Sequence, residues 1–179
     1  EYFLVLDEYY QQRIDLKLTG RTLFGAMAPK GQELEDHYFG SIKRKVSAFM
    51  KDLDHELWRY GIPSKTKHNE VAPAQHEVAC VYSKVNITSD NNHLLMQIMQ
   101  DIAKKHGLRC LLHEKPFAGV NGSGKHDNWS VITNTGINLF NPGANPIENK
   151  PFIATLACTI KAVDEYADLL RMSIASAGN

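Results

Sequence analysis

The 179-residue sequence lacks a long hydrophobic run, an excess of charge of either sign and a cysteine-rich pattern. No apolar stretch approaches the roughly 20 residues that a membrane-spanning helix needs, and the first residues do not combine a basic segment with an apolar one. Twenty basic residues balance twenty acidic ones without long blocks of one sign. We therefore expect a soluble, cytoplasmic protein with neither a membrane nor a nucleic acid as its partner.

The three cysteines are far apart in the sequence. Cys80, Cys110 and Cys158 lie among apolar neighbours. An odd and widely spaced set is typical of reduced thiols rather than of disulfides or a metal centre. We expect all three side chains to be buried.

The two ends of the sequence resemble cuts within a larger domain. Glu1 leads directly into the strand-like run of residues 2–6, and the helix-stop signal at Gly178 and Asn179 normally leads into another element. The hydrophobic fraction of 43% nevertheless predicts a folded core. We expect a piece of one globular domain.

Three segments carry apolar residues at helical spacing. The first covers residues 33–60, with a possible break near Asp52, and the second covers residues 90–106. The third begins at Pro151, a residue that favours the first turn of a helix. We expect the apolar faces of all three helices to pack in the core.

Five shorter segments have strand character, namely residues 2–6, 66–71, 76–86, 108–112 and 129–133. They occur in groups between the helices, without a regular alternation of strand and helix. This order favours an α+β fold over a doubly wound α/β sheet.

A glycine-rich segment comes close to a phosphate-binding loop. Residues 119–125 fit the first seven positions of the pattern G-x-x-x-x-G-K-[ST], but His126 occupies the eighth. The strand-like residues that follow also contradict a loop that must open a helix. The segment therefore predicts a turn that lets a ligand approach the backbone, with Asn121 available for hydrogen bonds. The alternative is a surface hairpin with a solvated lysine and histidine.

Two glutamates, Glu70 and Glu77, lie seven positions apart in strand-like sequence. On one straight strand this odd spacing would place them on opposite faces. Pro73 lies between them and predicts a bend that brings both carboxylates to one side. Clustered carboxylates suit Mg²⁺ or Mn²⁺. The alternative is a half-buried hairpin with two exposed glutamates.

Three motifs together resemble those of one enzyme family, the glutamine synthetases. Residues 115–130, KPFAGVNGSGKHDNWS, match its ATP-region signature, in which K-P is followed by N-G-x-G-x-H and then by a serine four positions later. Residues 69–79, NEVAPAQHEVA, look like its double-glutamate metal segment, and residues 1–4, EYFL, resemble its first metal-binding strand. The chain is thus identified as a member of this family.

The amino-acid sequence also resembles that of the type III subgroup, in the segments GRTLFGA, KGQELEDHYFG and SIASAGN. The similarity spans essentially the whole chain. It implies that residues 1–179 are a partial catalytic domain, truncated at both ends, without the small amino-terminal domain. It also implies an α+β fold with a curved, mainly antiparallel sheet backed by helices.

The family resemblance implies an ATP-dependent ligation of ammonia to glutamate. Glutamate accepts the γ-phosphoryl group of ATP to form γ-glutamyl phosphate, and ammonia then displaces phosphate to give glutamine. Mg²⁺ or Mn²⁺ is the implied cofactor, because phosphoryl transfer depends on charge neutralisation. The family's active sites lie between the subunits of a homo-oligomeric ring, so we expect the isolated chain to be inactive.

The same resemblance assigns expected roles to eight residues. Three carboxylates bind the first metal and one imidazole binds the second; two loop residues bind glutamate and two further residues bind the nucleotide. In that order they are Glu1, Glu70 and Glu77; His126; Asn121 and Gly122; His68 and Ser130. The family's glutamate two positions before Glu1, and its later arginines and glutamate, are absent from the sequence.

Two alternative functions fit the same scaffold. One is another glutamate–amine ligase, which would differ in the amine that it consumes. The other is a non-catalytic structural relative, although such a protein has no need of Glu1, Glu70, Glu77 and His126 at these places. Binding of Mn²⁺ or Mg²⁺ separates the second alternative from an enzyme.

Overall fold

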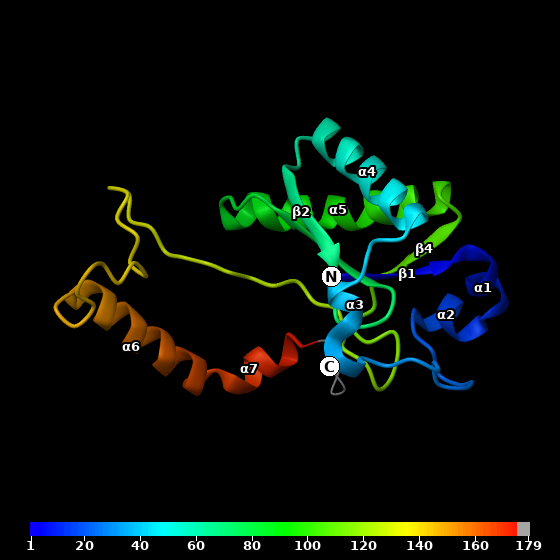
Figure 1. Ribbon diagram of the computed structural model, residues 1–179. Helices are drawn as coiled ribbons and strands as arrows, with labels where there is room; N and C mark the ends of the chain where they lie inside the picture. Colours follow the sequence, from blue (N-terminus) through cyan, green and yellow to red (C-terminus); the bar gives the residue numbers. More distant parts are fainter. Residues whose placement is uncertain (175–179) are drawn as a thin grey trace. The chain divides into compact units, whose positions relative to one another are not determined.

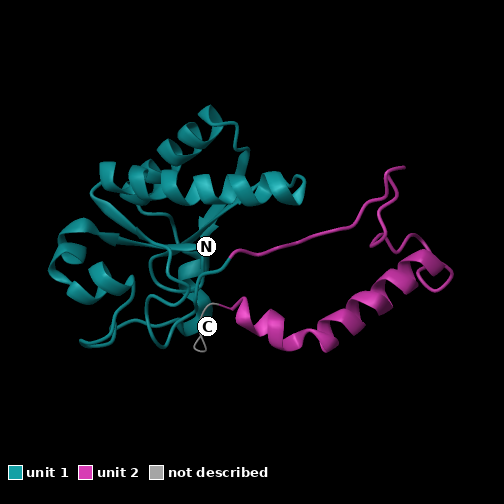
Figure 2. Ribbon diagram, turned by 180° about the vertical axis from the view of Figure 1, so that it is seen from behind, with its two compact units in different colours: residues 1–124 teal, residues 125–179 magenta. Residues whose placement is uncertain are grey.

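The computed structural model describes residues 1–174 (Figure 1). It divides into two compact units, residues 1–124 and 125–179, which Figure 2 distinguishes by colour. The predicted stop signal at Gly178 and Asn179 lies outside the described residues. No helix among the described residues is long and apolar enough to cross a membrane.

The first unit is built around a four-stranded sheet. Its strands are β1 (Tyr2–Leu6), β2 (Ser64–Asn69), β3 (Gln75–Cys80) and β4 (Leu108–Leu111). They lie in the order β2-β3-β1-β4, and every neighbouring pair is antiparallel. The predicted α+β class with an antiparallel sheet and helices is confirmed.

One face of the sheet packs against the two long helices, α4 (Arg44–Arg59) and α5 (Val85–Lys105). Tyr2 and Leu4 of β1 and Leu108 of β4 share one buried cluster with the apolar stripes of both helices. Tyr2 and Leu4 are two positions apart, and Leu108 pairs with Leu6, the next residue on the same side of β1, so all of them point to the same face. The main core therefore lies on this side of the sheet.

The opposite face is covered only in part. Phe3 and Leu111 pack there with Leu16 of the short helix α2 (Ile14–Thr19), which follows α1 (Asp7–Gln12). A smaller cluster on this face leaves room for polar groups.

The helix predicted over residues 33–60 is interrupted, but the predicted position of the break is wrong. A 3-10 turn, η1 (Glu33–Glu35), and the short helix α3 (Asp36–Phe39) come first, and the backbone then extends at Gly40 before α4 begins. Asp52 lies within the continuous helix α4. Glycine has a low helix propensity, which makes Gly40 a weaker position than Asp52.

The strand predicted over residues 76–86 is too long, because β3 ends at Cys80 and α5 already begins at Val85. Val85, Ile87 and Thr88 are β-branched and favour a strand locally. They nevertheless extend the helix whose buried stripe begins at Leu95, so tertiary packing overrides local propensity.

The second unit contains α6 (Lys150–Glu165) and α7 (Ala167–Met172). Pro151 lies in the first turn of α6, as predicted, and the Asn149 side chain caps it by accepting a hydrogen bond from the Phe152 N–H at 3.2 Å. The predicted strand at residues 129–133 is wrong, because this segment forms only an isolated bridge between Ile132 and Asn138. A strand needs a partner along its whole length.

Two expectations about burial are also wrong. The apolar face of α6 is largely exposed, as Leu156 and Ile160 show, because nothing within the described part of its unit covers it. Among the cysteines only Cys110 is buried, in the main core, and burial raises the pKa of its thiol. Cys80 ends β3 and Cys158 lies on the exposed helix α6, and both are exposed.

Candidate metal and substrate site

The double-glutamate segment is a tight β-hairpin. Residues 70–74 form the turn between β2 and β3, with Ala74 at a positive φ of 62°. The Glu70 N–H donates to the Gln75 carbonyl at 2.9 Å, and His68 pairs directly with Glu77. The bend expected at Pro73 is therefore a complete chain reversal, which places the two glutamates on adjacent strands.

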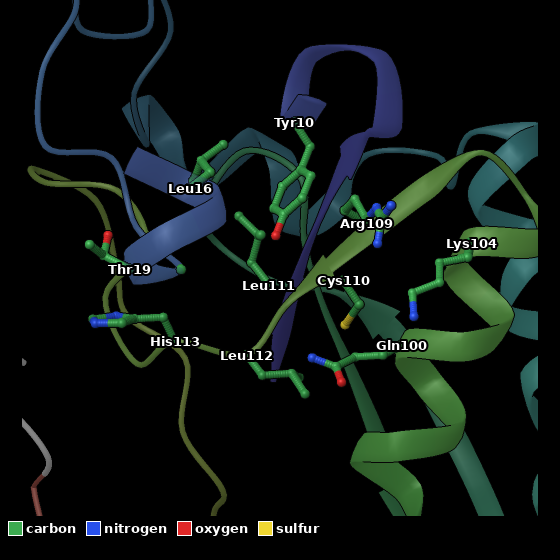
Figure 3. A pocket seen from close by; sticks show the side chains of 11 residues that line it. Tyr10, Leu16, Thr19, Gln100, Lys104, Arg109, Cys110, Leu111, Leu112 and His113 are labelled. Carbon is green, nitrogen blue, oxygen red and sulfur yellow. The ribbon is translucent and has the colours of Figure 1, made fainter. Parts of the chain in front are cut away.

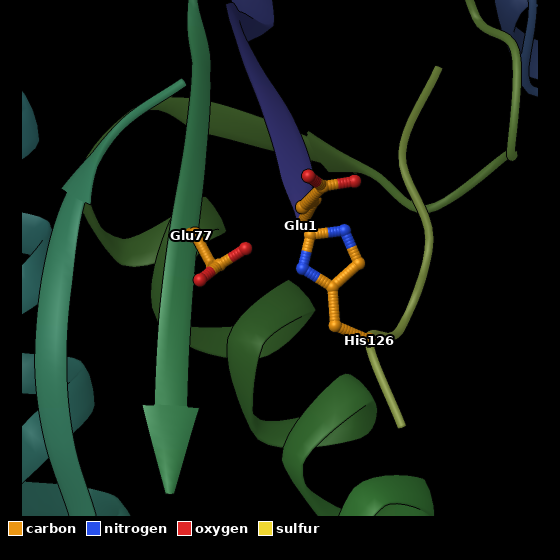
Figure 4. A group of neighbouring side chains, drawn as sticks. All are labelled: Glu1, Glu77 and His126. Atoms are coloured by element: carbon orange, nitrogen blue, oxygen red, sulfur yellow. The ribbon is translucent and has the colours of Figure 1, made fainter. Parts of the chain in front are cut away.

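The register of the sheet brings three acidic residues to one face. His68 and Glu70 are two positions apart, and Glu77 lies opposite His68 on the neighbouring strand. The histidine and both glutamates therefore share a face. Tyr2 pairs with His76, which places Glu1 beside Glu77 (Figure 4). This is the sheet face opposite the long helices α4 and α5.

The distances within this carboxylate cluster are short. His68 Nδ1 lies 3.5 Å from Glu70 Oε1, and His68 Nε2 lies 3.4 Å from Glu77 Oε1. A carboxylate oxygen of Glu1 lies within 4.8 Å of one of Glu77. All four residues are partly buried. The structure thus brings together the three predicted ligands of the first metal, and it adds His68, for which the family resemblance implies a nucleotide contact.

The electrostatics of the cluster favour a bound cation. Desolvation raises the pKa of Glu70, and the neighbouring charges of Glu1 and Glu77 raise it further, while His68 opposes the shift. Carboxylate oxygens gathered at these distances are ligands suited to a hard divalent ion. The residues present therefore fit Mg²⁺ or Mn²⁺.

The glycine loop lies next to this cluster. The Gly124 N–H donates to Glu1 Oε2 at 2.8 Å, so the loop and the first predicted metal ligand are in direct contact. Asn121 Oδ1 accepts a hydrogen bond from Gln32 Nε2 at 3.1 Å. Residues 121–131 form no helix, which agrees with the prediction that this loop is not a phosphate-binding loop that opens a helix.

Two predicted site residues belong to the second unit. His126, also drawn in Figure 4, is exposed there. Ser130 is exposed as well, and its Oγ accepts a hydrogen bond from Asn138 Nδ2 at 3.4 Å. Their assignment to the second metal and to the nucleotide stays a prediction.

A segment without a predicted site role lies along the site. Within residues 22–40, Thr22 N–H donates to the Pro116 carbonyl at 2.9 Å, and the Gly40 carbonyl accepts from Asn69 Nδ2 at 2.9 Å. The ring of Tyr38 lies 5.5 Å from that of His68. These contacts join positions far apart in sequence, so no local pattern could have indicated them.

A separate cavity of about 410 Å³ lies along the open edge of β4 (Figure 3). Its lining includes two cationic side chains, Lys104 and Arg109. Each is already ion-paired, Arg109 with Asp7 at 2.5 Å and Lys104 with Asp101 at 3.5 Å. None of the carboxylate cluster lines this cavity, which offers no uncompensated charge to a ligand.

Comparison with known proteins identifies close relatives of the chain. It is 65% identical to a glutamine synthetase of Butyrivibrio fibrisolvens over all 179 residues, which are 26% of that protein. It is 52% identical to the Type-3 glutamine synthetase of Dictyostelium discoideum, again over the full chain, covering 24% of that protein. The chain thus spans about a quarter of the length of these relatives.

Solved structures give the same fold. The structure titled "Apo GmaS without ligand" superposes with a TM-score of 0.52 at 21% identity, covering 78% of this chain and 30% of the other. The "GmaS/ADP complex-Conformation 1" gives 0.52 at 25% identity, covering 78% and 29%. The family model for the glutamine synthetase catalytic domain matches residues 1–176. The chain therefore belongs to the glutamine synthetase catalytic-domain family.

Proposed function

We propose that this chain contributes the first-metal cluster, and part of the glutamate and nucleotide sites, of an ATP-dependent glutamate–ammonia ligase. The observation that carries this proposal is the convergence of Glu1, Glu70 and Glu77 on one sheet face, beside the loop of residues 121–124. Family membership supports the proposed reaction, in which γ-glutamyl phosphate would form and ammonia would replace phosphate. The activity is proposed for a family-length protein that contains this chain.

The three glutamates would hold Mg²⁺ or Mn²⁺. A bound ion of this kind neutralises charge on the transferring phosphoryl group. The chain itself supplies the negative field that attracts the ion, and the Gly124 N–H holds the Glu1 carboxylate in place. His126 is proposed as the ligand of a second metal on the strength of the family motif.

The loop residues would bind the substrate glutamate. Gly122 has no side chain, so its backbone can approach a ligand closely, and Asn121 offers an amide that donates and accepts hydrogen bonds. His68 and Ser130 are proposed to contact the nucleotide. One structural neighbour is titled as a complex with ADP, which supports nucleotide binding on this scaffold. A neighbouring subunit in a ring would complete the site.

An assay on a family-length protein tests this proposal. We expect release of ADP that requires glutamate, ammonia and Mg²⁺ or Mn²⁺, with glutamine as the product. Consumption of a different amine, with no turnover of ammonia, would indicate the alternative ligase. A protein that neither turns over ATP nor binds Mn²⁺ would be a structural relative, and the proposal would fail.

Two neighbouring substitutions test the role of His126. His126→Ser creates the complete G-x-x-x-x-G-K-S pattern, yet we expect it to abolish activity because the imidazole is lost. Lys125→Ala serves as the control and should change activity little, since the family motif leaves that position free. Unchanged ATP turnover in His126→Ser would refute the metal assignment.

The isolated 179-residue chain should form negligible glutamine, because it carries only part of the proposed site. Its first unit contains the whole carboxylate cluster, so it should still bind Mn²⁺. Coupled measurement of ADP release tests the first statement. Turnover in the ordinary enzymatic range, about 1 to 1,000 per second, would show that the chain is sufficient by itself.

A further inference from the structure

Gln75 is a buried polar residue between the two halves of the candidate site. It is the first residue of β3, two positions before Glu77 and on the same face of the sheet. Its exposed fraction is only 2%. A buried amide needs hydrogen-bond partners for its donor and its acceptor atoms, so the partners of Gln75 reveal what it holds.

The amide of Gln75 joins the hairpin turn to the glycine loop. Its Nε2 donates to the Gly122 carbonyl at 2.8 Å and to Ser123 Oγ at 3.0 Å. Its Oε1 accepts from the Ala72 N–H at 3.3 Å. The loop partners are 47 and 48 positions away in sequence. One side chain therefore connects the segment that carries the carboxylates with the segment proposed to bind glutamate.

We infer that Gln75 is a positioning residue for the substrate glutamate. By fixing the Gly122 carbonyl, it sets the orientation of the loop relative to Glu70 and Glu77. The carboxyl group of a bound glutamate then lies at a defined distance from the metal cluster. This inference rests on the proposed function, because it assigns the consequence of the contact to glutamate binding.

The chemistry of glutamine explains why this residue type is suited to the position. One NH₂ group serves two acceptors while the carbonyl oxygen serves one N–H donor. Glutamate at the same position would lose the donor and add negative charge beside Glu70 and Glu77. Methionine would fill a similar volume but leave the Gly122 carbonyl and the Ala72 N–H without their partner.

The main test compares Gln75→Met with the wild type in a family-length protein. We expect kcat/KM for glutamate to fall about 10- to 100-fold, the effect of a small misplacement of a substrate. The KM for ATP and the affinity for Mn²⁺ should each stay within about twofold, because the Gln75 side chain bonds only to Ala72, Gly122 and Ser123, and its backbone bond with Glu70 is kept. The control is Gln97→Met on the exposed side of α5, which should leave all three values unchanged.

Hydrogen exchange of the loop gives a readout that does not depend on activity. Amides of residues 121–124 should exchange faster in Gln75→Met than in the wild type, since the loop loses two hydrogen bonds. Ser123→Ala removes only one of them and should raise the KM for glutamate less. Combined with Gln75→Met it should add little, because the two residues share one interaction.

The outcomes separate this inference from the proposed function. A wild type without glutamate-dependent ATP turnover would refute the proposed function, and with it the assignment of Gln75 to glutamate binding. An active wild type whose Gln75→Met variant keeps both its KM for glutamate and its loop exchange would overturn the inference alone. If Gln75→Met fails to fold, an unchanged KM for glutamate and unchanged loop exchange in Ser123→Ala would overturn it as well.

Discussion

The two faces of the sheet differ sharply although the same strands form them. On the helix face, Tyr2 and Leu4 of β1 are buried in the main core with α4 and α5. On the other face, Glu1 and Glu77 approach each other closely and help to raise the pKa of Glu70. Because successive residues of a strand point to opposite faces, one strand can supply both the core and the site.

The difference between the two faces indicates which of them stabilises the folded protein. Carboxylates held a few ångströms apart repel one another, so the site face costs free energy in the absence of a cation. Apolar burial on the helix face offsets this cost. Residues of the helix face should therefore govern folding, and residues of the site face should govern ligand binding.

The largest expected effect comes from Glu77→Gln on the site face. Loss of a direct ligand should weaken Mn²⁺ binding by more than the roughly 10- to 100-fold seen when only the groups that support a ligand are changed. The free energy of unfolding of the metal-free protein should stay equal or rise, since one repulsive charge is removed. Titration calorimetry and urea unfolding measure the two quantities.

The matched control for this change is Glu56→Gln on α4, which removes a carboxylate that pairs with Arg59 and not with the cluster. It should leave Mn²⁺ affinity unchanged. Equal Mn²⁺ binding by Glu77→Gln and the wild type would show that the two faces do not divide their roles in this way.

The next largest effect is expected from Phe49→Ala on the helix face. Phe49 is fully buried in α4, so its truncation should lower the free energy of unfolding by about 3 to 5 kcal/mol. Under conditions where the variant is still folded, its Mn²⁺ affinity should match that of the wild type. Phe39→Ala, at a side chain that is 79% exposed, should change stability by no more than about 0.5 kcal/mol.

The two faces should also respond to acid in opposite directions. Burial, assisted by Lys43, lowers the pKa of His76 to about 4 on the helix face. The unfolded state therefore binds more protons between pH 6.5 and 4, and stability should fall by about 3 kcal/mol as the pH drops through this window. The raised pKa of Glu70 acts with the opposite sign, because the folded state takes up a proton first.

Urea unfolding of the metal-free protein at several pH values measures this difference. His76→Gln should remove most of the acid destabilisation between pH 6.5 and 4, and Glu70→Gln should make the loss of stability on acidification steeper. A pH profile of His76→Gln that superposes on that of the wild type would contradict the assignment of this titration to His76.

The smallest effect is expected at the rim of the helix face, where Lys67 forms an ion pair with Asp54. The pair is partly solvated, so Lys67→Met should cost about 0.2 to 1 kcal/mol, and added salt should reduce the cost. A loss as large as that expected for Phe49→Ala would mean that charge, and not apolar burial, supports this face.

Much of the fold and of the candidate site was predictable from local sequence. The strand at residues 2–6, the end of α5 before Gly107 and the first turn of α6 at Pro151 follow from apolar spacing and from stop and start signals. The motifs included Glu1, Glu70 and Glu77, whereas the structure added His68 to the cluster. Pro73 predicted a bend between Glu70 and Glu77, and the structure turned it into a complete reversal. Such signals depend only on residues that are close in sequence, so they can be recognised without knowledge of the tertiary structure.

Only the tertiary structure decided how these pieces meet. Strand register placed Glu1 beside Glu77, and long-range hydrogen bonds of Gln75 and Gln32 fixed the loop. Tertiary context also decided that residues 129–133 form no strand and that the apolar face of α6 is exposed. The physical reason is common to all of these cases: pairing and burial depend on partners distant in sequence, so a local pattern gives the capacity for a contact and not the contact itself.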